Sequence, residues 1–433
     1  MTDRFVVMPK YEAYKDSGAE WLGDIPINWD LLANKYIFKL KKNQVGKKSK
    51  DYVLLSLTLN GVIKRDMENP QGKFPAEFDT YQEVKSGDFI FCLFDVEETP
   101  RAVGLSPFNG MITGAYTVFE SRDIFDKKFF YYFYLNLDAN KLMKPLYKGL
   151  RNTIPKERFF EFKSFVPPAK EQTAIANFLD HKTIQIDQAI AIKEKQIELL
   201  KESKQILIQN TVTQGLDPKV PMKNTAVDWI GKIPKHWNIK KLVHVAKIDS
   251  GATPDRSRPD YWGGKIPWLK TGEINYKLIE SSEEYITEAG MRNASVRLAP
   301  VGTLLMAMYG QGITRGRVAL LGIQAAYNQA CCSIQLNKDF LKEYGLAFFT
   351  AAYQHVRDDG NESSQMNLSA GYISTLKITL PPLHEQKLIV KFLETETNRI
   401  NIAIDLQNQQ IEKLKEYKMT LINSAVTGKI KVS

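Results

Sequence analysis

A loop rich in glycine and arginine offers the clearest chemistry in this sequence. It reads YGQGITRGR from Tyr309 to Arg317. Glycine lets a backbone approach phosphate groups closely, and arginine or glutamine can form paired hydrogen bonds with the edge of a base. We therefore expect Tyr309, Gln311, Thr314, Arg315 and Arg317 to contact DNA. The alternative is that these side chains form an ordinary solvated surface.

Two other polar segments have the same character. GATPDRSRPDYWGGKIPWLKTG, from Gly251, interleaves basic with aromatic side chains, and LYKGLRN places basic residues shortly before a probable strand. At the place that matches LYKGLRN, the later part of the chain has ESSQMNL. The side chains predicted to contact DNA from these segments are Arg256, Arg258, Lys265, Lys148, Arg151, Asn152 and Gln365.

The motifs of catalysis are missing from the sequence. The spacing of Gly312 and Gly316 resembles a phosphate-binding loop but lacks its lysine, and neither a serine nucleophile elbow nor a His-Glu-x-x-His zinc motif occurs. The two Pro-Pro pairs lack the flanking residues of an adenine methyltransferase motif. Five scattered histidines and three cysteines, expected to be reduced and buried, give no metal-binding pattern. We predict no catalytic residues, metal or cofactor in this chain, with an unrecognised nuclease or methyltransferase site as a remote alternative.

The elements that must position these loops occur twice. WLGDIPINW, Trp21 to Trp29, returns as WIGKIPKHW, Trp229 to Trp237, and a longer match begins at Pro167 and again at Pro381. The chain is thus a tandem duplication of a turn, a globular segment and a long helix. We expect the tryptophans and prolines of the turn to anchor each segment. The predicted boundaries are 1–166 and 216–380 for the globular segments, and 167–215 and 381–433 for the helices.

Each helical segment runs for about 40 residues without an internal glycine or proline, which corresponds to roughly 60 Å. Gly215 and Gly428 stand where the pattern ends, as helix terminators. Apolar residues recur with the two-position heptad spacing of a coiled coil, and one seam position is polar in each copy, Lys193 and Gln407. The alternative is that each helix packs on its own globular segment. The predicted seam residues are Leu179, Ile186, Ile190, Ile197, Leu200, Leu207, Leu393, Ile400, Ile404, Ile411, Leu414 and Leu421.

The positive charge lies outside the helices. The chain has a net charge of +10, whereas residues 170–212 and 384–426 each contain equal numbers of basic and acidic residues. The globular segments are therefore the basic parts, suited to a polyanionic partner. The sequence has neither a run long and apolar enough to span a membrane nor a secretory signal, which predicts a cytoplasmic protein without a membrane partner.

The globular segments are predicted to be mixed α/β. In the first, YVLLSLT, GDFIFCLF and GAYTVFE are probable strands and KKFFYYFYLNLDANKLM a probable helix. In the second, the matching strands are GTLLMAMYG, RVALLG and ACCSIQL, and the matching helix is FLKEYGLAFFTAAYQHVR. The fold class is therefore α+β, with two globular segments separated by two long helices.

Four motifs in this order resemble the specificity subunits of type I restriction-modification systems. They are WIGKIPKHW, GATPDRSRPDYWGGKIPWLKTGEI, YGQGITRGRVALLG followed by NQAC, and PPLHEQ at the start of the long helix. The likeness covers nearly the whole chain. The first globular segment resembles the family in the order of its elements but lacks the glycine-arginine loop.

The resemblance implies a non-catalytic, sequence-specific DNA-binding subunit. Two target-recognition domains would each read one half of a split double-stranded DNA target, with pseudo-twofold symmetry. The helices would pair antiparallel, set the spacing and dock two methyltransferase subunits, which use S-adenosylmethionine. It also allows a restriction subunit that uses ATP and Mg²⁺. The alternative from a different class is a non-enzymatic coiled-coil scaffold, or a protein that bridges nucleic acids without sequence preference.

Overall fold

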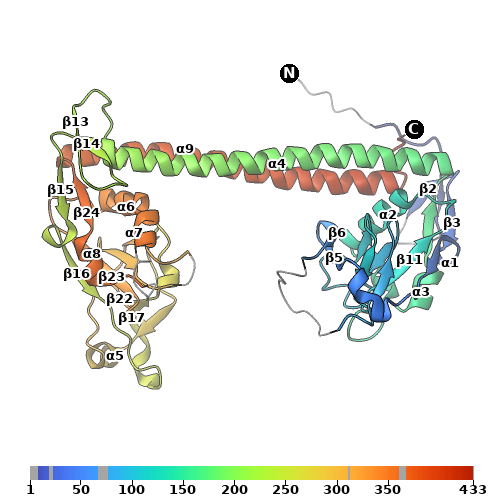
Figure 1. The fold of residues 1–433 in the computed structure, drawn as a ribbon, viewed down its shortest axis with the longest axis horizontal. Coiled ribbons are helices and arrows are strands. Elements are labelled where there is room, and N and C mark those ends of the chain that lie inside the picture. The colour runs from blue at the N-terminus through green and yellow to red at the C-terminus, as the bar shows by residue number, and fades with distance from the viewer. Residues whose placement is uncertain (1–7, 19–22, 67–76, 311–312, 360–366, 433) are drawn as a thin grey trace. The chain divides into compact units, whose positions relative to one another are not determined.

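The computed structural model describes residues 8–18, 23–66, 77–310, 313–359 and 367–432. The chain divides into two compact units, residues 1–193 with 408–433 and residues 194–407. Each unit contains one globular segment and part of both long helices (Figure 1). Among the described residues, no helix has both the length and the apolar character needed to cross a membrane.

The two predicted long helices are present. They are α4, Ala169–Gln214, with 46 residues, and α9, Leu383–Val426, with 44 residues. At about 1.5 Å per residue each is between about 65 and 70 Å long. Gly215 and Gly428 follow the helix ends with φ of +75° and +72°. This left-handed conformation costs glycine little and is typical of the residue that ends a helix, as the sequence predicted.

The helices pair antiparallel, as expected for this fold class. In the first unit, the Asp187 carboxylate of α4 lies 2.7 Å from the Lys418 ammonium of α9. In the second unit, Lys204 of α4 donates to the side-chain oxygen of Asn401 at 2.8 Å. A step of 17 residues forward along α4 therefore corresponds to a step of 17 residues backward along α9.

The predicted seam residues lie on the inward-facing side of the helices. All twelve are buried or half-buried. Lys193, the polar seam position of α4, donates a hydrogen bond to Gln410 of α9. A polar contact of this kind can fix helix register, because a shift would leave its partners unpaired.

The first globular segment is built around a four-stranded sheet with the strand order β4-β11-β8-β9 among the described residues. Helix α2, Lys127–Ala139, packs against it. The Asp126 carboxylate caps α2 by accepting from the backbone N–H groups of Lys128 and Phe129, both at 3.0 Å. The strands are β1 Tyr14–Asp16, β2 Asp24–Pro26, β3 Asp30–Ala33, β4 Phe38–Leu40, β5 Leu55–Thr58, β6 Gly61–Lys64, β7 Gln82–Val84, β8 Phe89–Phe91, β9 Val103–Leu105, β10 Gly110–Ile112, β11 Thr117–Ser121 and β12 Lys163–Val166; the short helices are α1 Asn34–Ile37 and α3 Lys156–Glu161.

Aromatic side chains fill the space between this sheet and its helices. Phe91 of β8 and Phe119 of β11 each place their ring centroid 4.9 Å from that of Phe159 in α3. Phe38 of β4 packs edge-on against Phe89 at 5.1 Å. All five rings are fully shielded from solvent or nearly so. Such rings bury much apolar area, and their edge-on and stacked contacts add to that burial, so this cluster stabilises the packing of the sheet against its helices.

The second globular segment has a larger sheet. Among its described residues, five strands have the order β16-β23-β20-β21-β18 and three more the order β19-β17-β22. The long helix expected here is two helices, because the chain turns at Ala352 between them. The strands are β13 Met222–Asn224, β14 Lys232–Pro234, β15 Asn238–Lys241, β16 Ala246–Ser250, β17 Trp262–Leu269, β18 Leu278–Ile279, β19 Glu284–Ile286, β20 Leu304–Ala307, β21 Val318–Leu321, β22 Ala326–Tyr327, β23 Cys331–Leu336 and β24 Lys377–Leu380; the shorter helices are α5 Glu288–Asn293, α6 Lys342–Ala351, α7 Tyr353–Asp359 and α8 Ala370–Thr375.

The repeated turn joins the first globular segment to both long helices. Trp29 is fully buried, and its indole nitrogen donates to the Glu171 carboxylate, in the first turn of α4, at 3.1 Å. Gly428, just after the end of α9, packs so closely that an added Cβ would lie 2.4 Å from Pro26 and 3.4 Å from Trp29. We call Trp29, Glu171 and Gly428 the first clasp. Trp21 of the same turn lies outside the described residues.

The second copy of the turn forms the same arrangement in the second unit. Trp237 is fully buried and donates to the Glu385 carboxylate, in the first turn of α9, at 2.8 Å. A Cβ added to Gly215, after the end of α4, would lie 3.1 Å from the Trp237 ring. We call Trp237, Glu385 and Gly215 the second clasp. The anchoring role predicted for the turn thus has a definite form, in which one tryptophan contacts the start of one helix and the end of the other.

Candidate nucleic-acid interface

A short hairpin presents the predicted contacts of the first globular segment. The backbones of Lys148 and Thr153 pair through two hydrogen bonds, of 2.8 and 3.1 Å, and the chain turns between them. Lys148 and Arg151 are exposed, and Asn152, with φ of +43°, is half-buried. The hairpin therefore carries two positive charges that are accessible to a phosphate backbone.

A groove of about 610 Å³ lies beside this hairpin and includes its Thr153. Three lysines line the groove, Lys41, Lys42 and Lys156, and none of the described residues that line it is acidic. Lys41 is paired with Asp88 at 2.6 Å, whereas Lys42 and Lys156 are exposed. The groove is therefore a basic surface suited to a polyanion.

Groups that could read a base lie in the same groove. Gln44 is exposed, and Gln82 donates its amide hydrogen to the Tyr116 carbonyl at 2.6 Å. Burial raises the pKa of the Tyr116 phenol, which therefore stays a neutral hydroxyl at physiological pH. Sequence reasoning missed Lys42, Gln44 and Lys156. No local motif marks them, because the groove is assembled from segments that are far apart in the chain.

The glycine-arginine loop of the second segment is held against α7. Arg315 is only 7% exposed, and its guanidinium donates to the Arg357 carbonyl at 2.7 Å. The Tyr353 hydroxyl donates to the Ile313 carbonyl at 2.6 Å. In this arrangement Arg315 stabilises the loop from inside, and its guanidinium does not face solvent as a base-reading group would.

The neighbours of Arg315 are more accessible. Tyr309 is 39% exposed, and Thr314 and Arg317 are half-buried. Of the predicted contacts, Gln311 in this loop and Gln365 further along the chain lie outside the described residues. Tyr309, Thr314 and Arg317 are thus the described side chains through which this loop could meet DNA.

Arg256 lies in an aromatic and acidic cage. Its guanidinium carbon is 3.8 Å from the Trp262 ring centroid and 4.9 Å from that of Trp268, within cation–π range. It also pairs with the Glu284 carboxylate at 2.6 Å. Because Arg256 is still 53% exposed at its side chain, its outer edge can meet a phosphate while its inner edge supports the loop.

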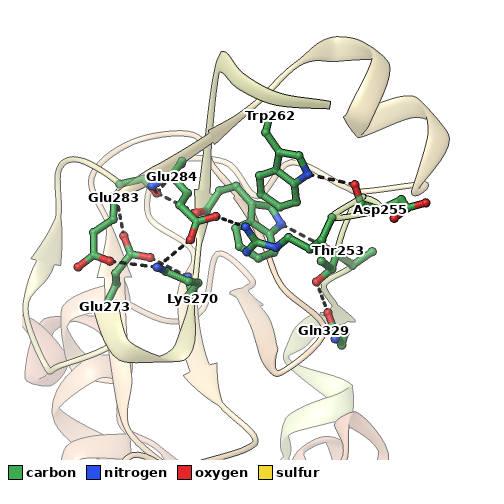
Figure 2. Close-up of polar contacts among 12 residues, drawn as sticks. Thr253, Asp255, Trp262, Lys270, Glu273, Glu283, Glu284 and Gln329 are labelled. Carbon is green, nitrogen blue, oxygen red and sulfur yellow. Dashed lines mark hydrogen bonds and ion pairs between the residues drawn. The ribbon is translucent and has the colours of Figure 1, made fainter. Parts of the chain in front are cut away.

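A network of charges continues from this cage. Figure 2 shows the Lys270 ammonium between Glu283, at 3.1 Å, and Glu284, at 2.9 Å. Hydrogen bonds from Lys270 and Arg256 hold the pKa of Glu284 below its ordinary value. The indole nitrogen of Trp262 donates to the Asp255 carbonyl at 3.1 Å, which closes the loop on itself (Figure 2).

The two remaining basic residues predicted in this segment differ in their surroundings. Arg258 forms two hydrogen bonds with the Asp260 carboxylate, both at 2.9 Å, and lies over the Tyr261 ring. Lys265 is exposed on β17. The predicted contacts therefore do not form one cluster: Arg256 and Arg258 are partly neutralised by carboxylates, and Lys265 stands on a strand.

The described residues include the side-chain types that contact nucleic acid. No group of three or more histidine, cysteine, aspartate or glutamate side chains among them is placed to hold a metal ion. All three cysteines are buried, and burial raises the pKa of the Cys332 thiol to about 12, so it stays protonated. Basic grooves, exposed arginines and amide side chains are the groups that contact phosphates and base edges.

The chain is similar in sequence to specificity subunits of type I restriction enzymes. The model of the type I restriction modification DNA specificity domain matches residues 104–202 and 234–416. The putative type I restriction enzyme MjaX specificity subunit of Methanocaldococcus jannaschii is 24% identical over 435 residues, which cover 95% of this chain and 96% of that protein. The MjaIX specificity subunit of the same organism is 30% identical over 190 residues, 43% of each chain. The EcoR124I/EcoR124II specificity subunit of Escherichia coli is 23% identical and covers 66% of this chain and 72% of that protein.

Two solved structures share the fold. A chain from a study of complex assembly and conformational transition in the type I R-M system superposes with a TM-score of 0.68 at 12% identity, over 93% of this chain and 98% of that one. The HsdS subunit of Thermoanaerobacter tengcongensis superposes with a TM-score of 0.52 at 14% identity, over 94% of this chain and 98% of that one. At these identities the superpositions concern the fold alone.

Proposed function

Because the chain belongs to the family of type I restriction-modification DNA specificity subunits, we propose that its two globular segments each read one half of a split DNA target. Members of this family recognise DNA and do not catalyse its modification. The proposal rests on one observation above all, the duplication of the clasp. Trp29 with Glu171, and Trp237 with Glu385, attach two different globular segments to the helix pair in the same way.

Two basic but different segments suit a target with two different halves. The first presents a groove with Lys42 and Lys156 beside a hairpin, and the second presents a glycine-arginine loop and the Arg256 cage. Base specificity requires side chains that differ between the halves, whereas phosphate contacts can be similar. The loops differ between the two segments whereas the clasp is repeated, and this contrast supports separate half-sites.

We propose that the antiparallel helices set the distance between the half-sites. Paired helices with a continuous seam resist bending, and their polar contacts fix the register. One pair in each unit, Asp187 with Lys418 and Lys204 with Asn401, crosses between the helices. The gap between the half-sites should then depend on helix length.

The outer faces of the helices suit protein partners, and we assign them to two methyltransferase subunits. Ile184, Ile192, Leu199 and Ile206 of α4 are each at least 50% exposed. They recur every seven or eight residues and so lie along one face of the helix, apart from the seam. Exposed apolar side chains in a row are typical of an interaction surface.

Mapping of methylated adenines across the host genome, with this gene intact and deleted, tests the proposed function. We expect one split motif, with two short blocks around a fixed gap, to lose methylation on deletion. Unchanged methylation, together with DNA binding that shows little preference for sequence, would replace this proposal with a scaffold or a general nucleic-acid bridge.

A further inference from the structure

The hairpin of the first segment has an apolar residue at its tip. Leu150 has a relative exposure of 105%, so its side chain is completely open to solvent. It lies between Gly149, with φ of +70°, and Arg151, in the turn that joins Lys148 to Thr153. Turns favour glycine, asparagine, aspartate and serine, so a fully exposed leucine departs from the usual composition at this place.

Backbone hydrogen bonds to residues 93–96 fix the position of the hairpin. The backbone N–H of Asp95 donates to the Arg151 carbonyl at 2.9 Å, and that of Val96 donates to the Asn152 carbonyl at 3.4 Å. Just after the hairpin, the N–H of Ile154 donates to the Leu93 carbonyl at 2.7 Å. These bonds fix the second leg of the hairpin, and the Lys148–Thr153 pair ties the first leg to it. A partner would therefore meet Leu150 in a defined position without the cost of ordering a loop.

The charges around the tip indicate what the partner is. Lys148 and Arg151 flank Leu150 and are exposed, and the neighbouring groove adds Lys42 and Lys156. Glu97, near the base of the hairpin, is paired with Lys144 at 2.8 Å. A single apolar side chain between cations does not make an apolar patch for a protein partner. It does match the pattern of DNA-binding proteins that hold the backbone with basic residues and insert an apolar side chain between bases.

We propose that Leu150 is a wedge, which enters the DNA of one half-site between two adjacent base pairs and partly unstacks them. The inference rests on the proposed function and adds a way of recognition to it. A wedge selects base steps that unstack easily, so the first segment would read the deformability of its half-site as well as base edges. Lys148 and Arg151 would hold the phosphates on either side of the opened step.

Fluorescence of 2-aminopurine tests the wedge, because this base brightens when it loses its stacked neighbour. The full chain, assembled with its modification subunits, is mixed with duplexes of its mapped target that carry 2-aminopurine at one position at a time. We expect a rise at one step of one half-site that Leu150→Ala abolishes and Leu150→Met retains. Leu150→Ala should also weaken binding to the target about tenfold and leave binding to an unrelated duplex within about twofold.

A matched control is available in the same unit. Ile124 is 73% exposed, and the backbone N–H of Asp126, two residues later, donates to Gln172 at the start of α4. Ile124→Ala therefore removes an exposed apolar side chain near the start of α4. It should change neither the 2-aminopurine fluorescence nor the affinity for the target. A methyltransferase also turns its target adenine out of the duplex, and that separate signal should persist in Leu150→Ala.

The outcomes separate the wedge from the function on which it rests. If the complex that retains Leu150 prefers its target DNA and no 2-aminopurine signal depends on Leu150, the wedge is rejected and the proposed function stands. If Leu150→Ala prevents the modification subunits from joining, the leucine belongs to a protein interface and the wedge is likewise rejected. If the complex that retains Leu150 shows no preference for the target DNA, the wedge and the proposed function both fail.

Discussion

The indole nitrogen of Trp237 donates to the Glu385 carboxylate at 2.8 Å, from a ring that has no contact with solvent. The pair joins the turn before the second globular segment to the helix that follows it. Trp29 and Glu171 repeat the bond in the first unit, although 208 residues separate the tryptophans and 214 the glutamates. A hydrogen bond to a charged acceptor contributes more than a neutral one. One carboxylate in each unit therefore joins the turn to the start of a long helix through a strong hydrogen bond.

Removal of this carboxylate should destabilise the protein. Glu385→Ala leaves the Trp237 N–H buried without a partner, which we expect to cost about 1–3 kcal/mol. Glu171→Ala should cost more, because Glu171 accepts from Tyr11 and Asn28 as well as Trp29, whereas Glu385 contacts the half-exposed His236 besides Trp237. Thermal melting of the purified chain measures both, with Glu394→Ala, an exposed carboxylate of α9, as the control. Equal melting temperatures in all three variants would show that the clasps do not matter for stability.

The glycine of the first clasp should tolerate no side chain. Gly428→Ala places a Cβ 2.4 Å from Pro26 in a left-handed conformation. Gly18→Ala has the same conformation, with φ of +68°, but meets nothing within 4 Å. The backbone cost of about 1–2 kcal/mol is common to both, and the collision adds about 1–3 kcal/mol to Gly428→Ala alone. Chemical denaturation compares the two variants, and a smaller effect at Gly428 would contradict the close packing.

The helices and strands that the sequence predicted correctly are those set by short-range patterns of residues. The long helices follow from heptad spacing and the absence of glycine and proline, and Gly215 and Gly428 mark their ends. The strand candidates of the second segment correspond to β20, β21 and β23, since short apolar runs bounded by turn residues are a short-range signal. The prediction of one helix over residues 340–357 was wrong, because the structure has two helices, α6 and α7, with a turn at Ala352 between them.

The parts of the interface that depend on distant contacts could not be predicted. Arg315 looked like a base-reading residue, yet its partner is the carbonyl of Arg357, 42 residues later. The basic groove joins Lys42 to Lys156 through folding alone. For Arg256 a signal was present, since the neighbouring tryptophans are the rings on which it lies. The sequence indicated aromatic and basic residues together but not that they contact one another.

Arg317 and Arg315 should differ in their effects on DNA binding. Arg317→Ala should cost about 1–3 kcal/mol of affinity for one half-site and leave the stability of the protein unchanged, as expected for a half-buried side chain at the interface. Arg315→Ala should also lower the melting temperature, because it removes the bond to Arg357. Titrations with duplexes altered in either half-site measure the first effect. Equal loss of discrimination at both half-sites would argue against separate recognition segments.

Acid should open the Arg256 cage. Lys270 and Arg256 hold the pKa of Glu284 below its ordinary value of 4.5, so the folded state favours the carboxylate. This stabilisation is complete above pH 4.5 and is lost as the pH falls through the lowered pKa. Trp262, which lies against Arg256, should report the change in fluorescence, identified by the difference from Trp262→Phe. Glu284→Gln should remove the acid transition, and a transition that persists in this variant would assign it to another group.

Helix length provides the most direct test of the spacing between half-sites. Insertion of seven residues into both α4 and α9, next to Lys193 and Gln407, keeps the heptad pattern and adds about 10 Å to the pair. At about 3.4 Å per base pair, the methylated motif should acquire a gap longer by about three base pairs. The methylome of cells that carry the altered gene gives the new gap directly. Insertion into α4 alone is the control, because it shifts Asp187 and Lys204 differently against α9 and should abolish methylation. An unchanged gap after the double insertion would mean that the DNA adapts to the protein, and that the helices do not measure the target.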